Sequence, residues 1–319
     1  MTRKVSIRRV AAESGVAVCT ASRVFSGSAP VSEETRRAVL ETAHRLGYRS
    51  DTGRCRRIAV MLNAQSYSSV YEQELSRSLL ERIHGSGGLA MILTAQDMEL
   101  LSLGWIDGVI SCCYDVASER KLLESYDIPV VCVNNPTRSR DGIYAVNSDE
   151  EGAIRMVLEL LVSHGHERIA FLALQPMTVY THRYRRMLYE TICRETYRME
   201  PVVYEASRGE AILTLCRAVR DGVTAVMIPS ELRNSRYFQP LESLGIRIPE
   251  DLSVVSWESP GISEYFHPPL TTVEQNFGEL AAQSLELLEQ VRCRHSPLVN
   301  RLVAYRLHAR GTVAEPRRK

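Results

Sequence analysis

The side chains that could do chemistry in this sequence are concentrated at its beginning, and they are basic. Residues 1–57 hold twelve Lys or Arg against five Asp or Glu and carry a charge of +7, whereas the remaining residues carry −6. Such an excess of Lys and Arg suits the phosphates of a nucleic acid or an anionic membrane surface. We therefore expect a module that binds a polyanion, attached to a larger acidic body.

The sequence lacks the common catalytic motifs. It contains no GxxxxGK[ST] phosphate loop, no HExxH zinc motif and no GxSxG nucleophile elbow. His164 and His166 fall between an expected helix and an expected strand, where a structural role is more common than metal binding. The eight cysteines are scattered without a CxxC pair, which indicates reduced and mostly buried thiols. We therefore expect no enzyme activity, no metal, no cofactor, no membrane association and a cytoplasmic location.

Three short helices must position the basic residues. Apolar residues recur at helical spacing after Ser6, over residues 18–25, and after Ser32, with both serines suited to cap a helix. Gly15 separates the first two segments. This order is that of a helix-turn-helix, whose second helix enters the major groove of DNA. The expected apolar stripe of the third helix consists of Ala38, Val39, Ala43 and Leu46.

The segments VSIRRVAAESGVAVCTASRVFSG and VSEETRRAVLETAHRLGY resemble, without a gap, the DNA-binding head of the LacI/GalR family of bacterial transcription regulators. The resemblance implies that Val18, Cys19 and Arg23 contact base edges. Arginine pairs well with guanine, and hydroxyl groups suit phosphate oxygens. The alternative is that Val18 and Cys19 pack inside the head and that Arg23 is a solvated charge. The resemblance also implies phosphate contacts by Ser6, Thr20, Ser22, Ser32 and Thr35.

From Ile58 onward, short runs rich in Val and Ile alternate with amphipathic segments. This alternation predicts parallel sheets that are covered on both faces, arranged as two Rossmann-like lobes with a cleft between them. The expected fold class is multidomain, with an all-α head and a two-lobed α/β core. The expected strands are IAVML, LAMIL, DGVIS, PVVCV, IAFLA, PVVY, AVMI and LSVVS. The expected helices span 71–83, 118–126, 151–163, 183–195, 210–221 and 237–244.

The body resembles the periplasmic-binding-protein-like core of the same family through motifs that include GHERIAF, PEDLSVV and PPLTTV. In that fold the chain crosses between the lobes three times. Residues 96–104 are shorter than the helix that most members have at this place. The branch resembling the evolved β-galactosidase repressor shares this short segment, which points to a galactoside as the effector. The expected domains are a head (1–50), a short basic linker (51–57) and a core (58–319), with lobe one at about 58–147 and 276–304 and lobe two at about 148–275 and 305–319.

The same resemblance implies a site for a small effector in the core. Arg185 could bridge sugar hydroxyls or hold a carboxylate, whereas its alternative role is a solvated charge on an Arg-rich helix. Trp257 could stack on a sugar, and its alternative role is a core aromatic. Asn134, Ser230 and Glu258 depart from the Asp, Asn and Asp that are usual in the family. The implied effector contacts are Asn134, Arg185, Ser230, Trp257, Glu258 and Gln275.

The resemblance implies a repressor that binds a pseudo-palindromic double-stranded DNA operator and responds to a small molecule, with a sugar expected. The final segment RGTVAEPRRK carries no leucine heptad, so a homodimer is expected rather than a tetramer. The segment RSDTGRCRR between Tyr48 and Ile58 is short and offers only Cys55 as an apolar wedge, so little DNA bending is expected. The alternatives are a sugar-binding protein or enzyme that shares the two-lobed fold, and a regulator with a degenerate ligand site.

Overall fold

The structure is a computed structural model, and it divides the chain into two compact units. The first comprises Met1–Ala145 and Ala281–Val299, and the second comprises Val146–Leu280 and Asn300–Lys319. The residues that the structure describes are 5–26, 29–46, 48, 57–63, 70–103, 105–113, 128–134, 144–175, 180–229, 238–257, 261–292 and 300–317.

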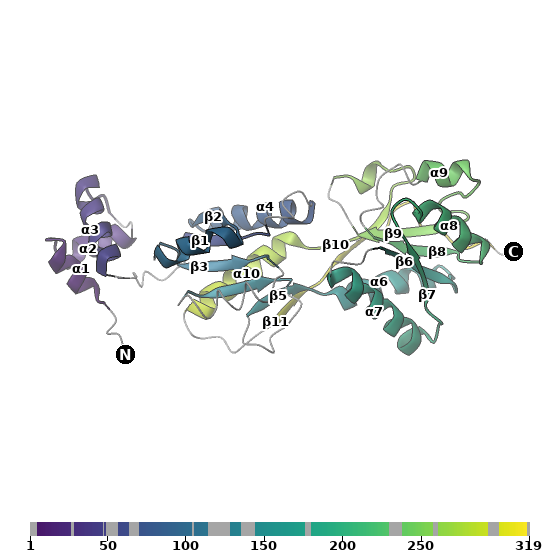
Figure 1. The fold of residues 1–319 in the computed structure, drawn as a ribbon, viewed down its shortest axis with the longest axis horizontal. Coiled ribbons are helices and arrows are strands. Elements are labelled where there is room, and N and C mark those ends of the chain that lie inside the picture. The colour runs from purple at the N-terminus through teal and green to yellow at the C-terminus, as the bar shows by residue number, and fades with distance from the viewer. Residues whose placement is uncertain are drawn as a thin grey trace. The chain divides into compact units, whose positions relative to one another are not determined.

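The N-terminal head consists of three helices, α1 (Ile7–Glu13), α2 (Val18–Ser26) and α3 (Glu33–Leu46) (Figure 1). Gly15 lies between α1 and α2 with a φ of +71°, a left-handed conformation that glycine adopts without strain. One expectation for α3 is wrong, because Ala38 is exposed and does not belong to the apolar stripe. The buried core of the head is formed by Val10, Ala11, Ala21, Val24, Val39 and Ala43.

One six-stranded sheet has the strand order β11-β5-β4-β3-β1-β2, and its β1–β2, β1–β3 and β3–β4 pairs are parallel. Helix α10 packs on it so closely that a Cβ atom on Gly108 would lie 2.9 Å from Leu288. The strands are β1 (Arg57–Met61), β2 (Leu89–Leu93), β3 (Gly108–Ser111), β4 (Val130–Val133), β5 (Ala145–Ser148) and β11 (Asn300–Val303). The associated helices are α4 (Val70–Gly85), the 3-10 helix η1 (Ala95–Leu103) and α10 (Phe277–Arg292).

The short segment between β2 and β3 forms the 3-10 helix η1 rather than a full α-helix. Met98 and Leu101 of η1 are buried against alternate residues of the sheet, including Ala59 and Met61. Trp105 follows η1 and remains 54% exposed.

The second six-stranded sheet has the order β12-β10-β9-β8-β6-β7, and β12 is antiparallel to β10 while the other pairs are parallel. Its strands are β6 (Ile169–Leu174), β7 (Val202–Ala206), β8 (Ala225–Ile228), β9 (Ser253–Trp257), β10 (Thr271–Glu274) and β12 (Arg306–His308). The helical elements are α6 (Glu150–Ser163), α7 (Tyr180–Ile192), the π-helical turn η3 (Cys193–Tyr197), α8 (Ala211–Arg220), α9 (Phe238–Ser243) and the 3-10 turn η5 (Ser263–Tyr265).

Strand β6 explains why the strand sequences in this unit are continuously apolar. Its residues alternate between two buried cores, with Leu172 packed among residues of α8 and α9 and Phe171 packed among residues of α6 and α7. Both faces of the sheet are therefore covered by helices, as expected for a parallel sheet.

The expected strands are present, and most of the expected helices are confirmed within one to three residues. The expected helix at 118–126 lies outside the described residues. Cys112 and Cys113 directly follow β3, and both are buried. Four strands and one helix were not expected from the sequence: β5, β10, β11, β12 and α10.

Candidate DNA-binding helix and ligand site

Helix α2 has one buried face and one exposed face. Ala21 is fully buried and Val24 is nearly so, which fixes the helix on α1 and α3. Val18 is 44% exposed, and Cys19 and Arg23 are exposed as well. Because Cys19 and Arg23 are four residues apart, they lie on the same side of the helix. The alternative that Val18 and Cys19 pack inside the head is therefore wrong.

Four of the hydroxyl residues expected to contact phosphates, Ser6, Thr20, Ser32 and Thr35, lie near helix starts of the head, and Ser22 lies in the middle of α2. Ser32 caps α3, because its Oγ accepts a hydrogen bond from the backbone N–H of Thr35 at 3.3 Å and donates to Thr35 Oγ1 at 2.8 Å. Ser6 occupies the capping position of α1, but its side chain makes no capping hydrogen bond, contrary to expectation. The Ser6 and Ser22 side chains are exposed, and Thr20 is half-buried.

In the second unit, the candidate ligand residues cluster where parallel strands end. Trp257 is the last residue of β9, and Gln275 directly follows β10. Asp149 follows β5 and caps α6 by accepting a hydrogen bond from the N–H of Gly152 at 3.0 Å. This cap places Glu150 in the first turn of α6. The carboxyl ends of parallel strands are where α/β proteins bind ligands, so this edge is a suitable position for a site.

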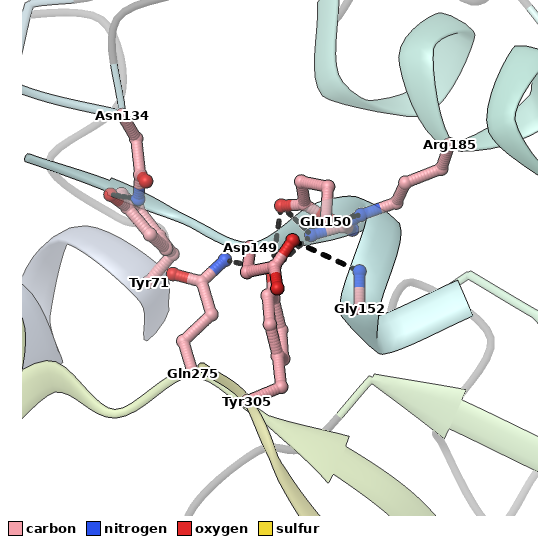
Figure 2. Close-up of polar contacts among 8 residues, drawn as sticks. All are labelled: Tyr71, Asn134, Asp149, Glu150, Gly152, Arg185, Gln275 and Tyr305. Carbon is pink, nitrogen blue, oxygen red and sulfur yellow. Dashed lines mark hydrogen bonds and ion pairs between the residues drawn. The ribbon is translucent and has the colours of Figure 1, made fainter. Parts of the chain in front are cut away.

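Arg185 of α7 forms a buried ion pair with Glu150. Its Nε donates to Glu150 Oε2 at 2.7 Å and its Nη2 donates to Glu150 Oε1 at 2.9 Å (Figure 2). The two residues are 8% and 7% exposed, so the alternative that Arg185 is a solvated charge is wrong. Burial opposes the charge of the guanidinium, but the carboxylate of Glu150 and the hydroxyl of Tyr305 outweigh it and raise the pKa of Arg185. Arg185 is therefore held as a cation inside the protein.

Tyr305 completes this network. Its hydroxyl donates to Glu150 Oε1 at 2.6 Å and accepts hydrogen bonds from Arg185 Nη2 at 3.1 Å and from Gln275 Nε2 at 2.9 Å. Figure 2 shows the four side chains pointing toward one another. Burial, together with the carboxylate of Glu150, raises the pKa of Tyr305 well above its usual value, so the hydroxyl keeps its proton.

Trp257 lies beneath the guanidinium of Arg185. The Cζ atom of Arg185 is 4.4 Å from the centroid of the Trp257 ring, a cation–π contact. Trp257 is only 6% exposed and belongs to the core between the sheet and helices α6 and α7. Its Nε1 is buried and has no hydrogen-bond partner among the described residues.

In the first unit, Asn134 directly follows β4 and adopts a φ of +52°, which favours Asn among non-glycine residues. Its Nδ2 donates to the hydroxyl of Tyr71, on α4, at 2.6 Å (Figure 2). Ser230 and Glu258, the other two implied effector contacts, lie outside the described residues.

Sequence reasoning missed Glu150 and Tyr305. Glu150 lies in the segment NSDEEGA, whose three consecutive acidic residues give no signal for which carboxylate turns inward. His164 and His166 serve the fold, because His166 is buried and its ring contacts Thr224 Oγ1 and Ser253 Oγ at 2.9 and 3.0 Å. Within the described ranges, no cluster of three or more His, Cys, Asp or Glu could hold a metal ion. In the same part of the chain, no helix is both long and apolar enough to cross a membrane.

Two protein-family models match the chain. The model for bacterial regulatory proteins of the lacI family matches residues 6–51, and the model for a periplasmic binding protein-like domain matches residues 158–313. The chain is therefore similar to bacterial regulators of the lacI family in its head and to periplasmic binding protein-like domains in its core. The curated relatives that it matches are transcriptional regulators.

Curated relatives cover most of the chain. It is 24% identical over 304 residues to the HTH-type transcriptional repressor PurR of Mannheimia succiniciproducens, covering 89% of this chain and 90% of that protein. It is 28% identical over 306 residues to catabolite control protein A of Priestia megaterium, covering 89% and 91%.

Solved structures share the fold. The lac repressor dimer bound to operator and an anti-inducer superposes with a TM-score of 0.71 at 20% identity, covering 98% of this chain and all of that one. A complex of the regulator CelR with cellobiose superposes with a TM-score of 0.66 at 22% identity, covering 97% and 100%. These similarities establish the head and the two-lobed α/β core of parallel sheets.

Proposed function

We propose that this protein is a repressor that binds a pseudo-palindromic double-stranded DNA operator as a homodimer. The observation that carries the proposal is the division of α2 into a buried face and an exposed face that presents Val18, Cys19 and Arg23. In a helix-turn-helix, side chains on the exposed face of the second helix contact base edges in the major groove. The exposed hydroxyls of Ser6 and Ser22 would contact phosphates, together with Thr20, Ser32 and Thr35.

We further propose that a small molecule changes the affinity for the operator. The polar network at the carboxyl edge of the second sheet supports this proposal, because Arg185, Trp257 and Gln275 converge there. We also propose Asn134, Ser230 and Glu258 as effector contacts. We propose a sugar as the effector, with galactosides as the first candidates because of the short segment 96–104. Structures that share the fold have been solved with cellobiose and with D-xylulofuranose.

The proposed domains are the head at 1–50, the linker at 51–57 and the core at 58–319. A second candidate function is a regulator that binds DNA without responding to a ligand. The pairing of Arg185 with Glu150 and Tyr305 favours it, because Nε and Nη2 already have partners and have less to offer a ligand.

The operator proposal is tested by selecting sequences from a random double-stranded DNA pool with the full chain. We expect one enriched motif with two-fold symmetry, and sedimentation should show a dimer on that DNA. Enrichment of no motif would contradict the proposal. A thermal-shift screen of neutral sugars, followed by titration of the operator complex with each one that binds, separates the two candidates. Release of the operator by a bound sugar favours the ligand-responsive regulator.

A further inference from the structure

We propose that Glu150 sets the charge class of the effector: by pairing with Arg185 it restricts the site to uncharged molecules that offer hydrogen-bond acceptor oxygens. This inference rests on the proposed function, because it concerns the molecule that the candidate ligand residues of the second unit would bind.

The position that an anionic ligand would take on Arg185 is already occupied. A carboxylate or phosphate binds arginine through two parallel hydrogen bonds, either from Nε and Nη2 or from Nη1 and Nη2. Here the two oxygens of Glu150 accept from Nε at 2.7 Å and from Nη2 at 2.9 Å, and Nη2 gives its second hydrogen to Tyr305 at 3.1 Å, so both pairs of donors are engaged. The chain thus supplies its own carboxylate at the place where an acidic ligand would bind.

Displacement of Glu150 by a ligand is strongly unfavourable. Glu150 and Arg185 are both more than nine-tenths buried, and Tyr305 donates a further hydrogen bond to Glu150. An anion that took the place of Glu150 would leave a buried carboxylate without its cation, which costs much more than loss of a surface ion pair. An anion that bound beside the intact pair would meet the negative charge of Glu150. Anions are therefore disfavoured in both arrangements.

Trp257 adds a hydrogen-bond donor beside this ion pair. The Nε1–H of Trp257 is buried without a partner among the described residues, and an indole nitrogen can only donate. An acceptor oxygen would satisfy it, whereas an ammonium group offers no acceptor and would also be repelled by the guanidinium of Arg185, whose Cζ is 4.4 Å from the Trp257 ring. A sugar hydroxyl and the carbonyl of a neutral heterocycle share this acceptor chemistry.

The first experiment removes the internal carboxylate and asks whether an external one takes its place. The variant is Glu150→Ala in the full chain, and the probe is sodium acetate compared with sodium chloride at equal ionic strength. The control is Glu151→Ala, the next residue on α6, whose exposed carboxylate forms a surface ion pair with Arg155 at 2.8 Å.

We expect acetate to raise the melting temperature of Glu150→Ala more than chloride does. In the wild type and in Glu151→Ala, the two salts should give the same melting temperature. If the variant unfolds, acetate should restore its folded circular dichroism spectrum. Failure of acetate to stabilise or restore Glu150→Ala overturns the proposal, because Arg185 would then not be the anion-binding group that Glu150 satisfies.

The second experiment compares matched neutral and anionic molecules on the wild type by calorimetry. The pairs are D-galactose with D-galacturonate, and uracil with its 6-carboxylate, so that they distinguish a carbohydrate from a heterocyclic carbonyl. In each pair we expect the neutral molecule to bind more tightly, with a dissociation constant lower by about tenfold or more. Tighter binding of an anionic member overturns the proposal. The acetate experiment needs neither DNA nor the natural effector, so its result stands even if no ligand alters operator affinity and the proposed function fails.

Discussion

The hydroxyl of Tyr189 on α7 donates a hydrogen bond of 2.7 Å to the carbonyl oxygen of Ile169 at the start of β6. The same hydroxyl accepts a hydrogen bond of 3.0 Å from the backbone N–H of Val202 on the neighbouring strand β7. One buried side chain therefore joins a helix to the backbones of two adjacent strands. Burial raises the pKa of Tyr189, so the hydroxyl remains protonated and able to donate.

Replacement of Tyr189 by Phe should lower the free energy of unfolding by about 1–3 kcal/mol, because the N–H of Val202 and the carbonyl of Ile169 lose a buried partner. Urea unfolding followed by circular dichroism measures the loss. Tyr204→Phe is the control, because its hydroxyl bonds to Asp221 at the surface, and it should cost less. Equal losses in the two variants would show that burial of the Tyr189 bond adds nothing.

Arg185→Ala should lower the free energy of unfolding by about 3–5 kcal/mol, because Glu150 would remain buried without its cation. Arg186→Ala, at the next position, removes an arginine that is paired at the surface with Glu190 and Glu205 and should cost less than about 1 kcal/mol. Chemical denaturation of both variants tests the difference. A loss in Arg185→Ala that is no larger than in Arg186→Ala would contradict the prediction.

Arg23→Ala should weaken binding to the selected operator by about 1–3 kcal/mol while changing binding to random DNA much less, as expected for a base contact. Arg37→Ala is the matched control, because Arg37 is an exposed arginine on α3, and its loss should affect both DNAs equally. Fluorescence anisotropy at fixed salt measures the four affinities. An equal loss on both DNAs in Arg23→Ala would assign Arg23 to a phosphate.

The stability of the second unit should fall with decreasing pH because of His166. Burial lowers the pKa of His166 below 6.5, and the nearby His164 adds to this effect, so the folded protein favours the neutral ring. The unfolded chain then binds more protons than the folded chain, and stability is lost as the pH falls from about 6.5 toward the folded pKa. Melting temperatures between pH 5 and 8 should show this decline. His166→Gln should flatten the decline, whereas His164→Gln should retain it.

Operator binding should depend strongly on salt and bend the DNA little. The linker residues 51–57 are rich in arginine, and the segment between Tyr48 and Ile58 offers no large apolar side chain to insert between base pairs. End-to-end fluorescence transfer on the operator measures the bend. A sharp central kink in the bound DNA would contradict this prediction.

An element could be predicted from the sequence where its burial leaves a regular pattern of apolar residues. Strand β6 was predicted because both of its faces are buried, so its sequence is continuously apolar. Strands β11 and β12 were not assigned, because their residues are largely half-buried or exposed and resemble a loop. Ser32 was predicted as a cap from its residue type, because a cap is a local contact between positions only three residues apart.

The candidate ligand site was predictable only in part. Arg185 was named through family resemblance, but its partner Glu150 is 35 residues away and Tyr305 is 155 residues from Glu150. Contacts over such separations arise when parallel strands bring their carboxyl ends to one edge, and neither spacing nor residue type reveals which side chains meet there. As a result, Arg185, which was predicted to contact a ligand, has its charge balanced by Glu150 within the protein.

Each of the two compact units contains one tryptophan, and the two differ in their exposure to solvent. Trp105 belongs to the first unit and is 54% exposed, whereas Trp257 belongs to the second and is 6% exposed. Trp105 should therefore emit at longer wavelength and be quenched by iodide, while Trp257 should emit at shorter wavelength and resist quenching. Intrinsic fluorescence can thus follow each unit separately during unfolding or ligand binding, without any added label.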